Sequence, residues 1–245
     1  MERTTLEICC GSAEDALEAA RGGADRVELC SALFLGGLTP TLGTLQTVKA
    51  GTRVPVMAMV RPRSGGFCYT DTEMAVIRRD ARLLLDAGAD GLVFGFLRPD
   101  GTVDEARTRE LVALCGARES VFHRAFDVTP DWRRALETLI GLGVRRVLTS
   151  GQASSALLAL ETLREMRRFA GDAIEILPGA GIRLDNVARV LEVTGCDQVH
   201  LSCRKAVADP SAAGRGIHFG GALYPPEDVY EVTDAAGVAA IRERL

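Results

Sequence analysis

The chain has 245 residues, of which 47% are hydrophobic and 25% charged, and its net charge is −4. This length suits one (β/α)8 barrel and leaves little room for a second domain; the charge offers no basic surface to nucleic acid, and no apolar run is long enough to span a membrane. The first residues pass directly into a strand-like segment without an apolar leader, which predicts a cytoplasmic protein.

A unit of helix, glycine and short apolar strand recurs along the chain. Glycine suits the position after a helix because the left-handed conformation costs it no Cβ clash, and the apolar run that follows is typical of a buried parallel strand. The four clearest units begin at Gly23, Gly88, Gly143 and Gly195. Eight strands are predicted, at 5–9, 26–30, 55–60, 91–95, 120–124, 145–149, 174–177 and 198–202. The sequence therefore predicts one α/β domain over residues 1–245, a TIM barrel.

Two segments that follow predicted strands lack a helical pattern. They are 61–70, after the third strand, and 204–233, after the eighth. Loops of this length in a compact domain are often functional, and both segments follow the strand ends where TIM barrels hold their sites. We therefore expect both loops to lie over the C-terminal face of the barrel.

Polar side chains recur on the predicted inward faces of the strands. Alternation along each strand places its apolar residues against the helices and turns the others inward. The inward set comprises Glu7, Cys9, Arg26, Glu28, Cys30, Arg61, His123, Glu175, His200 and Ser202. A barrel interior filled only for stability would use Val, Ile and Leu, and ionisable groups are costly to bury unless they pair. The set favours a ligand site; a purely structural ion network of Glu7, Arg26, Glu28, Arg61 and Glu175 is the alternative.

The segment 121–127 carries the sharpest candidate. His123 ends the fifth predicted strand and can exchange a proton near neutral pH, so it is a candidate acid or base. Asp127 could orient it or bind substrate, while Arg124 could clamp an anion. The alternative is an Arg124–Asp127 loop ion pair beside a core histidine.

Two later turns could hold an anion. Residues 149–152 follow the sixth strand and residues 178–181 the seventh, and glycine-rich turns expose backbone N–H groups. The candidate ligand-binding residues are therefore Arg61, Arg124, Ser150, Gly151, Gly179, Gly181, His200 and Ser202.

Several common site types are missing from the sequence. Neither lysine, Lys49 or Lys205, lies on a predicted barrel strand, which argues against a Schiff-base aldolase. There is no G-x-G-x-x-G after a strand and no P-loop, so no nucleotide cofactor is indicated. The seven cysteines follow neither disulfide-framework nor zinc-site spacing and are expected to be reduced.

Runs along nearly the whole chain resemble the CutC family of copper-homeostasis proteins. They are 6–9 (LEIC), 22–30 (GGADRVELC), 36–40 (GGLTP), 61–63 (RPR), 122–127 (FHRAFD), 148–151 (LTSG), 178–181 (PGAG) and 200–202 (HLS). The resemblance implies a (β/α)8 barrel in the cytoplasm, allows a homo-oligomer, and implies copper binding.

Two functions remain open from the sequence. The first is Cu(I) binding, since Cu(I) favours thiolates and thioethers: Cys9 and Cys30 point inward from adjacent strands, and Met57 or Met59 could add a thioether. The second is an isomerase, lyase or hydrolase acting on a small anionic or polyhydroxylated metabolite, with copper incidental. There the catalytic candidates are His123, Glu28, Glu7 and Asp127, with Arg61 and Arg124 as anion clamps. A scaffold without a ligand has the least support.

Overall fold

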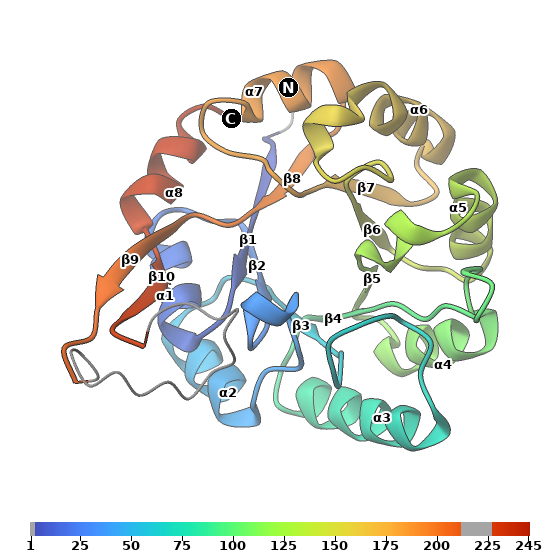
Figure 1. The fold of residues 1–245 in the computed structure, drawn as a ribbon, viewed down its shortest axis with the longest axis horizontal. Coiled ribbons are helices and arrows are strands. Elements are labelled where there is room, and N and C mark those ends of the chain that lie inside the picture. The colour runs from blue at the N-terminus through green and yellow to red at the C-terminus, as the bar shows by residue number, and fades with distance from the viewer. Residues whose placement is uncertain (1–2, 212–226) are drawn as a thin grey trace.

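The computed structural model describes residues 3–211 and 227–245 and shows a barrel of eight parallel strands ringed by helices (Figure 1). Each strand pairs with its neighbours in the order β7-β6-β5-β4-β3-β2-β1-β8. The strands are β1 (Thr5–Cys10), β2 (Arg26–Leu29), β3 (Val56–Met59), β4 (Gly91–Phe94), β5 (Glu119–Phe122), β6 (Arg146–Thr149), β7 (Glu175–Pro178) and β8 (Gln198–Leu201). The predicted TIM barrel is confirmed, with strand ends shifted by one or two residues.

The described residues form eight α-helices and three short 3-10 helices, all of which lie between strands except α8, which follows the last strand. The α-helices are α1 (Ala13–Arg21), α2 (Leu42–Gly51), α3 (Asp71–Asp86), α4 (Glu105–Cys115), α5 (Trp132–Gly141), α6 (Leu160–Ala170), α7 (Val187–Thr194) and α8 (Ala235–Arg242); the 3-10 helices are η1 (Leu33–Leu35), η2 (Arg124–Val128) and η3 (Ala156–Leu158). Gly23, Gly88, Gly143 and Gly195 all have φ between +69° and +95°, the conformation for which glycine was expected. In the described part of the chain, no helix is long and apolar enough to cross a membrane.

The buried side chains form two separate clusters. The larger lies between the strands and the helices, as the outward-facing apolar residues predict. The smaller lies inside the barrel and contains Cys30, Met57, Met59, Val93 and Val121. The ring closes between β7 and β8, which lie side by side without a backbone ladder. Across this seam, Gln198 Nε2 donates a hydrogen bond to Glu175 Oε2 over 3.2 Å.

The segment 204–233 is not an irregular loop at its two ends. Arg204–Ala208 forms β9 and Val229–Thr233 forms β10, an antiparallel pair outside the barrel (Figure 1). The prediction gave weight to the glycines and prolines of this segment and overlooked its Val, Tyr and Thr residues, which favour strands. Asp15 of α1 anchors the pair, because Thr233 N–H donates to one of its carboxylate oxygens. The middle of the predicted loop, 212–226, lies outside the described residues.

Candidate functional site

A cavity of 430 Å³ lies at the C-terminal ends of the strands. Eight of the predicted site residues line it: Cys9, Glu28, Cys30, Arg61, His123, Arg124, Asp127 and His200. Eight further residues complete the wall, of which only Met59, a candidate thioether ligand, was named from the sequence: Leu33, Gly36, Gly37, Met59, Phe67, Val128, Leu148 and Arg204. Loop 61–70 contributes Arg61 and Phe67, and Arg204 is the first residue of β9.

Two thiols and a carboxyl group meet at one end of the cavity. The parallel register pairs Cys9 of β1 with Glu28 of β2, and Cys30 follows directly after β2 on the same face. The Oε2 atom of Glu28 lies 3.3 Å from Cys9 Sγ and 3.6 Å from Cys30 Sγ. One ligand atom from each of the three residues lies within 4.8 Å of the others, a spacing that suits a single metal ion.

The charges at this end are set by a histidine and its acidic neighbours. A hydrogen bond with Cys30 lowers the pKa of Cys9 well below that of an ordinary thiol, against the cost of burial, and His200 lowers it further. The same bond and burial raise the pKa of Cys30, and burial raises that of Glu28. Burial alone would lower the pKa of His200. Its acidic neighbours instead raise it well above the ordinary value: Glu28, Cys9 and Glu7. This end of the cavity therefore brings a thiol of lowered pKa beside an imidazole of raised pKa.

His123, which lines the same cavity, is a neutral imidazole. Its Nδ1 atom accepts a hydrogen bond from Ala125 N–H, because His123 caps the N-terminus of η2. Burial, and the positive charge of Arg61, lower the pKa of His123 to about 3. The ring proton therefore resides on Nε2, a buried atom without a hydrogen-bond partner. This arrangement favours hydrogen-bond donation over the role of general base.

Arg61 is a buried guanidinium held by backbone carbonyl groups. It is 6% exposed, and it donates to the carbonyl oxygens of Leu35, Gly37 and Gly65. Across residues 3–211 and 227–245, no carboxylate lies within 4.0 Å of it, and its Nε–H has no acceptor. The site thus contains a positive charge that is fixed in place but not neutralised.

Asp127 occupies the first predicted anion-binding turn. Its carboxylate accepts hydrogen bonds from the backbone N–H groups of Ser150 and Gln152, from the Thr149 hydroxyl and from Arg124. The donors that were expected to hold an external anion therefore hold a carboxylate of the chain itself. The Arg124–Asp127 ion pair, one of the two alternatives for this segment, is present.

Replacing Asp127 by asparagine is expected to lower the free energy of unfolding by about 2 kcal/mol. The substitution replaces one acceptor oxygen by an NH₂ group, so the donors that bonded to that oxygen are left without an acceptor. Urea unfolding measures the change. Asp131→Asn is the matched control: Asp131 caps α5 by accepting from backbone N–H groups, which asparagine does equally well. Equal losses in both variants would contradict the role assigned to Asp127.

The remaining predicted ligand residues do not line the cavity. Gly151 has φ +75°, and its N–H donates to Thr149 Oγ1. Gly179 packs against His200, and a Cβ there would lie 2.7 Å from Leu148 Cδ1. Gly181 and Ser202 are exposed, Ser202 beyond the end of β8.

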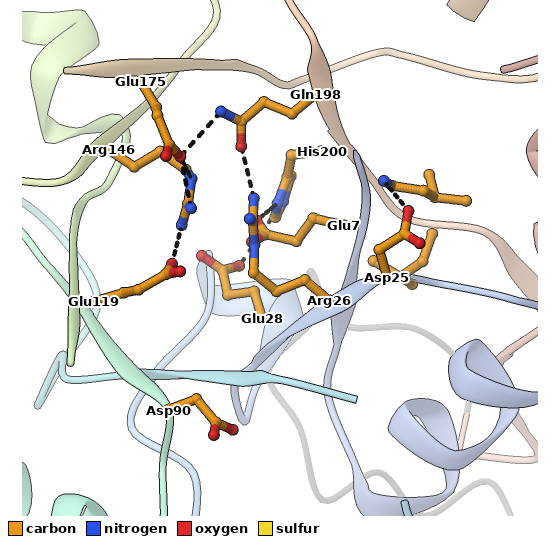
Figure 2. Close-up of polar contacts among 12 residues, drawn as sticks. Glu7, Asp25, Arg26, Glu28, Asp90, Glu119, Arg146, Glu175, Gln198 and His200 are labelled. Carbon is orange, nitrogen blue, oxygen red and sulfur yellow. Dashed lines mark hydrogen bonds and ion pairs between the residues drawn. The ribbon is translucent and has the colours of Figure 1, made fainter. Parts of the chain in front are cut away.

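Beneath the cavity lies a layer of buried ion pairs (Figure 2). Glu7 is 2% exposed and is bound by Arg26 and by His200 Nδ1, the latter at 2.7 Å. Arg26 also donates to Gln198. Arg146, likewise 2% exposed, bridges two further carboxylates, Glu119 and Glu175, each at 2.7 Å.

Part of the purely structural ion network that the sequence left open as an alternative is present in this layer. It includes Glu7, Arg26 and Glu175, but Glu28 and Arg61 belong to the cavity. Strand alternation predicts which face of the sheet a side chain occupies. Its depth in the barrel depends instead on the register of the strands: the Glu7–Arg26 pair lies two residues before the Cys9–Glu28 pair, further from the cavity. Arg146 was missed, although its alternation with Val147 in the sixth strand was a signal that it points inward.

The fold places the chain among TIM-barrel proteins that bind their ligands at the C-terminal strand ends. Within that class it belongs to the CutC family, whose model matches residues 4–205. The chain is 51% identical to a CutC protein of Treponema denticola, with 95% of each chain covered. It is 44% identical to the human copper homeostasis protein cutC homolog, over 96% of this chain and 87% of the other. The CutC structure from Streptococcus agalactiae superposes with a TM-score of 0.77 at 28% identity, covering 81% of this chain and 98% of that one. The family resemblance found in the sequence is confirmed.

Proposed function

We propose that this protein serves copper homeostasis in the cytoplasm by binding one Cu(I) ion between Cys9 and Cys30. The observation that carries the proposal is the pair of thiols brought together by β1 and β2, with both sulfur atoms within one ion's reach. The human relative named above is called a copper homeostasis protein. All seven cysteines are free thiols, as expected of a protein in a reducing compartment.

The donor atoms at this end of the cavity suit a soft monovalent metal. Cu(I) prefers thiolate and thioether sulfur, and the cavity wall adds Met59 to the two thiols. Contacts with Cys30 and His200 lower the pKa of Cys9, which favours its thiolate form. Cys9 is thus the more readily deprotonated of the two ligands.

Cys30 must lose its proton to become the second ligand. Its pKa is raised by its bond to Cys9 and by burial, so binding through its sulfur releases a proton. Affinity for Cu(I) should therefore increase with pH.

Anaerobic titration of Cu(I) against a competing chelator tests the proposal. We expect one tightly bound ion per chain in the wild type and at least about a 100-fold loss of affinity in Cys9→Ser and in Cys30→Ser, because each removes one of two soft ligands. Cys30→Ala provides a second variant in case serine disturbs the buried position.

Cys68→Ser is the matched control, because Cys68 is an exposed thiol on loop 61–70 that does not line the cavity. Circular dichroism verifies that each variant is folded. If wild-type affinity persisted in folded Cys9→Ser and Cys30→Ser, the thiol pair would not be the copper site.

A further inference from the structure

The wall of the cavity also carries two hydrogen-bond donors without acceptors. They are Arg61 Nε–H and His123 Nε2–H, and the two side chains are 6% and 4% exposed. Buried donors in folded proteins nearly always have partners, and leaving one unpaired costs free energy. Two such donors on the wall of one cavity therefore point to a ligand that both would bind.

Arg61 and His123 lie close together through a shared neighbour. The Phe67 ring centroid is 4.9 Å from that of His123 and 5.3 Å from Arg61 Cζ. Both residues line the same cavity, and the positive charge of Arg61 acts on the His123 ring. Both donor side chains thus adjoin the same phenyl ring in the wall of one cavity.

The charges of the two donor side chains indicate the charge of the ligand group that they would bind. Arg61 lacks a carboxylate partner within the described chain, and His123 is neutral, so the two donors together carry one positive charge. The other two guanidinium groups that line the cavity are paired, Arg124 with Asp127 and Arg204 with Glu231. A ligand group with one negative charge and two acceptor oxygens matches this arrangement.

We propose that Arg61 Nε–H and His123 Nε2–H form a binding site for the carboxylate group of a small organic acid. A phosphate group is a poorer match because the glycine turn that could supply backbone donors already holds the Asp127 carboxylate. The cavity volume of 430 Å³ limits the ligand to a small molecule. The remainder of that molecule would extend toward Cys9 and Glu28.

The ring of Phe67 covers the two donor side chains. The two unpaired donor atoms are closed to water, and the half-buried ring of Phe67 packs against both of their side chains. Entry of a carboxylate therefore requires the Phe67 side chain to turn aside. Since loop 61–70 carries both Phe67 and Arg61, the gate and one donor belong to the same segment.

Histidine side-chain ¹⁵N NMR on the metal-free protein tests the site. The chain has three histidines, His123, His200 and His218, so the three imidazole signals can be assigned with single variants. The probes are short-chain mono- and dicarboxylates, each paired with its neutral amide, and inorganic phosphate. We expect at least one carboxylate at about 10 mM to shift His123 Nε2, and its amide not to do so.

Calorimetry of the best probe then identifies the donors. Affinity should decrease at least about tenfold in Arg61→Gln and in His123→Asn; asparagine retains an acceptor for Ala125 N–H but cannot supply the ring donor. Arg61→Lys, which retains the charge but loses the planar fork, is the second variant if glutamine disturbs the loop. Arg133→Gln, which removes an exposed guanidinium on α5, should have no effect.

Three results would overturn the proposal: no carboxylate shifts His123, phosphate shifts it in place of every carboxylate, or affinity depends on Cys9 and not on Arg61. The site is independent of copper, because its donors lie in the loops that follow β3 and β5 and include neither thiol. Failure of Cu(I) to bind and failure of a carboxylate to bind are therefore separate results.

Discussion

Replacing Glu7 by leucine is expected to lower the free energy of unfolding by about 3–5 kcal/mol, the usual cost of breaking a buried ion pair by removing one partner. Glu7 is the shared acceptor for Arg26 and for His200. Without it the guanidinium of Arg26 stays buried with Gln198 as its remaining partner. The ionic partners compensate for the burial of Glu7 and hold its pKa below the ordinary range. Urea denaturation followed by circular dichroism gives the difference.

The double variant Glu7→Leu/Arg26→Met distinguishes two causes of the lost stability: the loss of the attraction between Glu7 and Arg26, and the burial of an unpaired Arg26 charge. If the cost of Glu7→Leu comes from the unpaired guanidinium, the second substitution should restore a large part of the stability. Glu165→Leu is the control, since it breaks an exposed pair with Arg133 and should cost less than about 1 kcal/mol. A loss in Glu7→Leu no greater than in Glu165→Leu would show that the layer contributes little.

The second large effect is a loss of stability in acid that depends on His123. Its pKa is about 3 in the folded protein against 6.5 for an unperturbed histidine, so between these values the unfolded chain binds a proton that the native state does not. Stability due to the neutral ring is therefore intact above pH 6.5 and lost as pH falls toward 3. The loss amounts to about 2 kcal/mol near pH 5 and about 4 kcal/mol near pH 3.

His123→Asn should remove this dependence. The comparison is the slope of unfolding free energy against pH, measured from about pH 7 to 5, in the wild type and the variant. His200, whose raised pKa gives stability below 6.5 that is lost at higher pH, is present in both proteins and cancels in the difference. Parallel pH profiles for the two proteins would mean that His123 is not buried as a neutral ring.

The barrel itself could be predicted because its signals are local and repeated. Glycine at four helix ends, followed by apolar strands, located the units, and alternation located the inward faces. Strand 5 shows the limit: it was extended to residue 124, but it ends at Phe122 because His123 caps η2 with its side chain. A side chain that accepts a hydrogen bond from a backbone N–H group of the following loop leaves no trace in the hydrophobic periodicity of the sequence.

The sequence predicted most of the residue types that line the candidate site. It did not predict how deep each side chain lies in the barrel or which charges are paired. Glu7 and Glu28 have the same place in the strand alternation, yet one lies in an ion layer and the other at the thiols. Asp127 illustrates a second limit: a turn that resembles an anion site also suits an acidic side chain of the same protein, and only the fold shows which one occupies it. The neutral state of His123 likewise depends on burial and on Arg61, neither of which a sequence pattern gives.

The position of His200 in the last strand of the barrel has a consequence for the newly made protein. Cys9 lies in β1 and Cys30 directly after β2, whereas the imidazole that helps to lower the pKa of Cys9 belongs to β8, which reaches β1 only when the ring closes. A growing chain on the ribosome thus carries the sulfur pair for most of its synthesis without this part of its activation. The full lowering of the Cys9 pKa therefore requires that the barrel be complete.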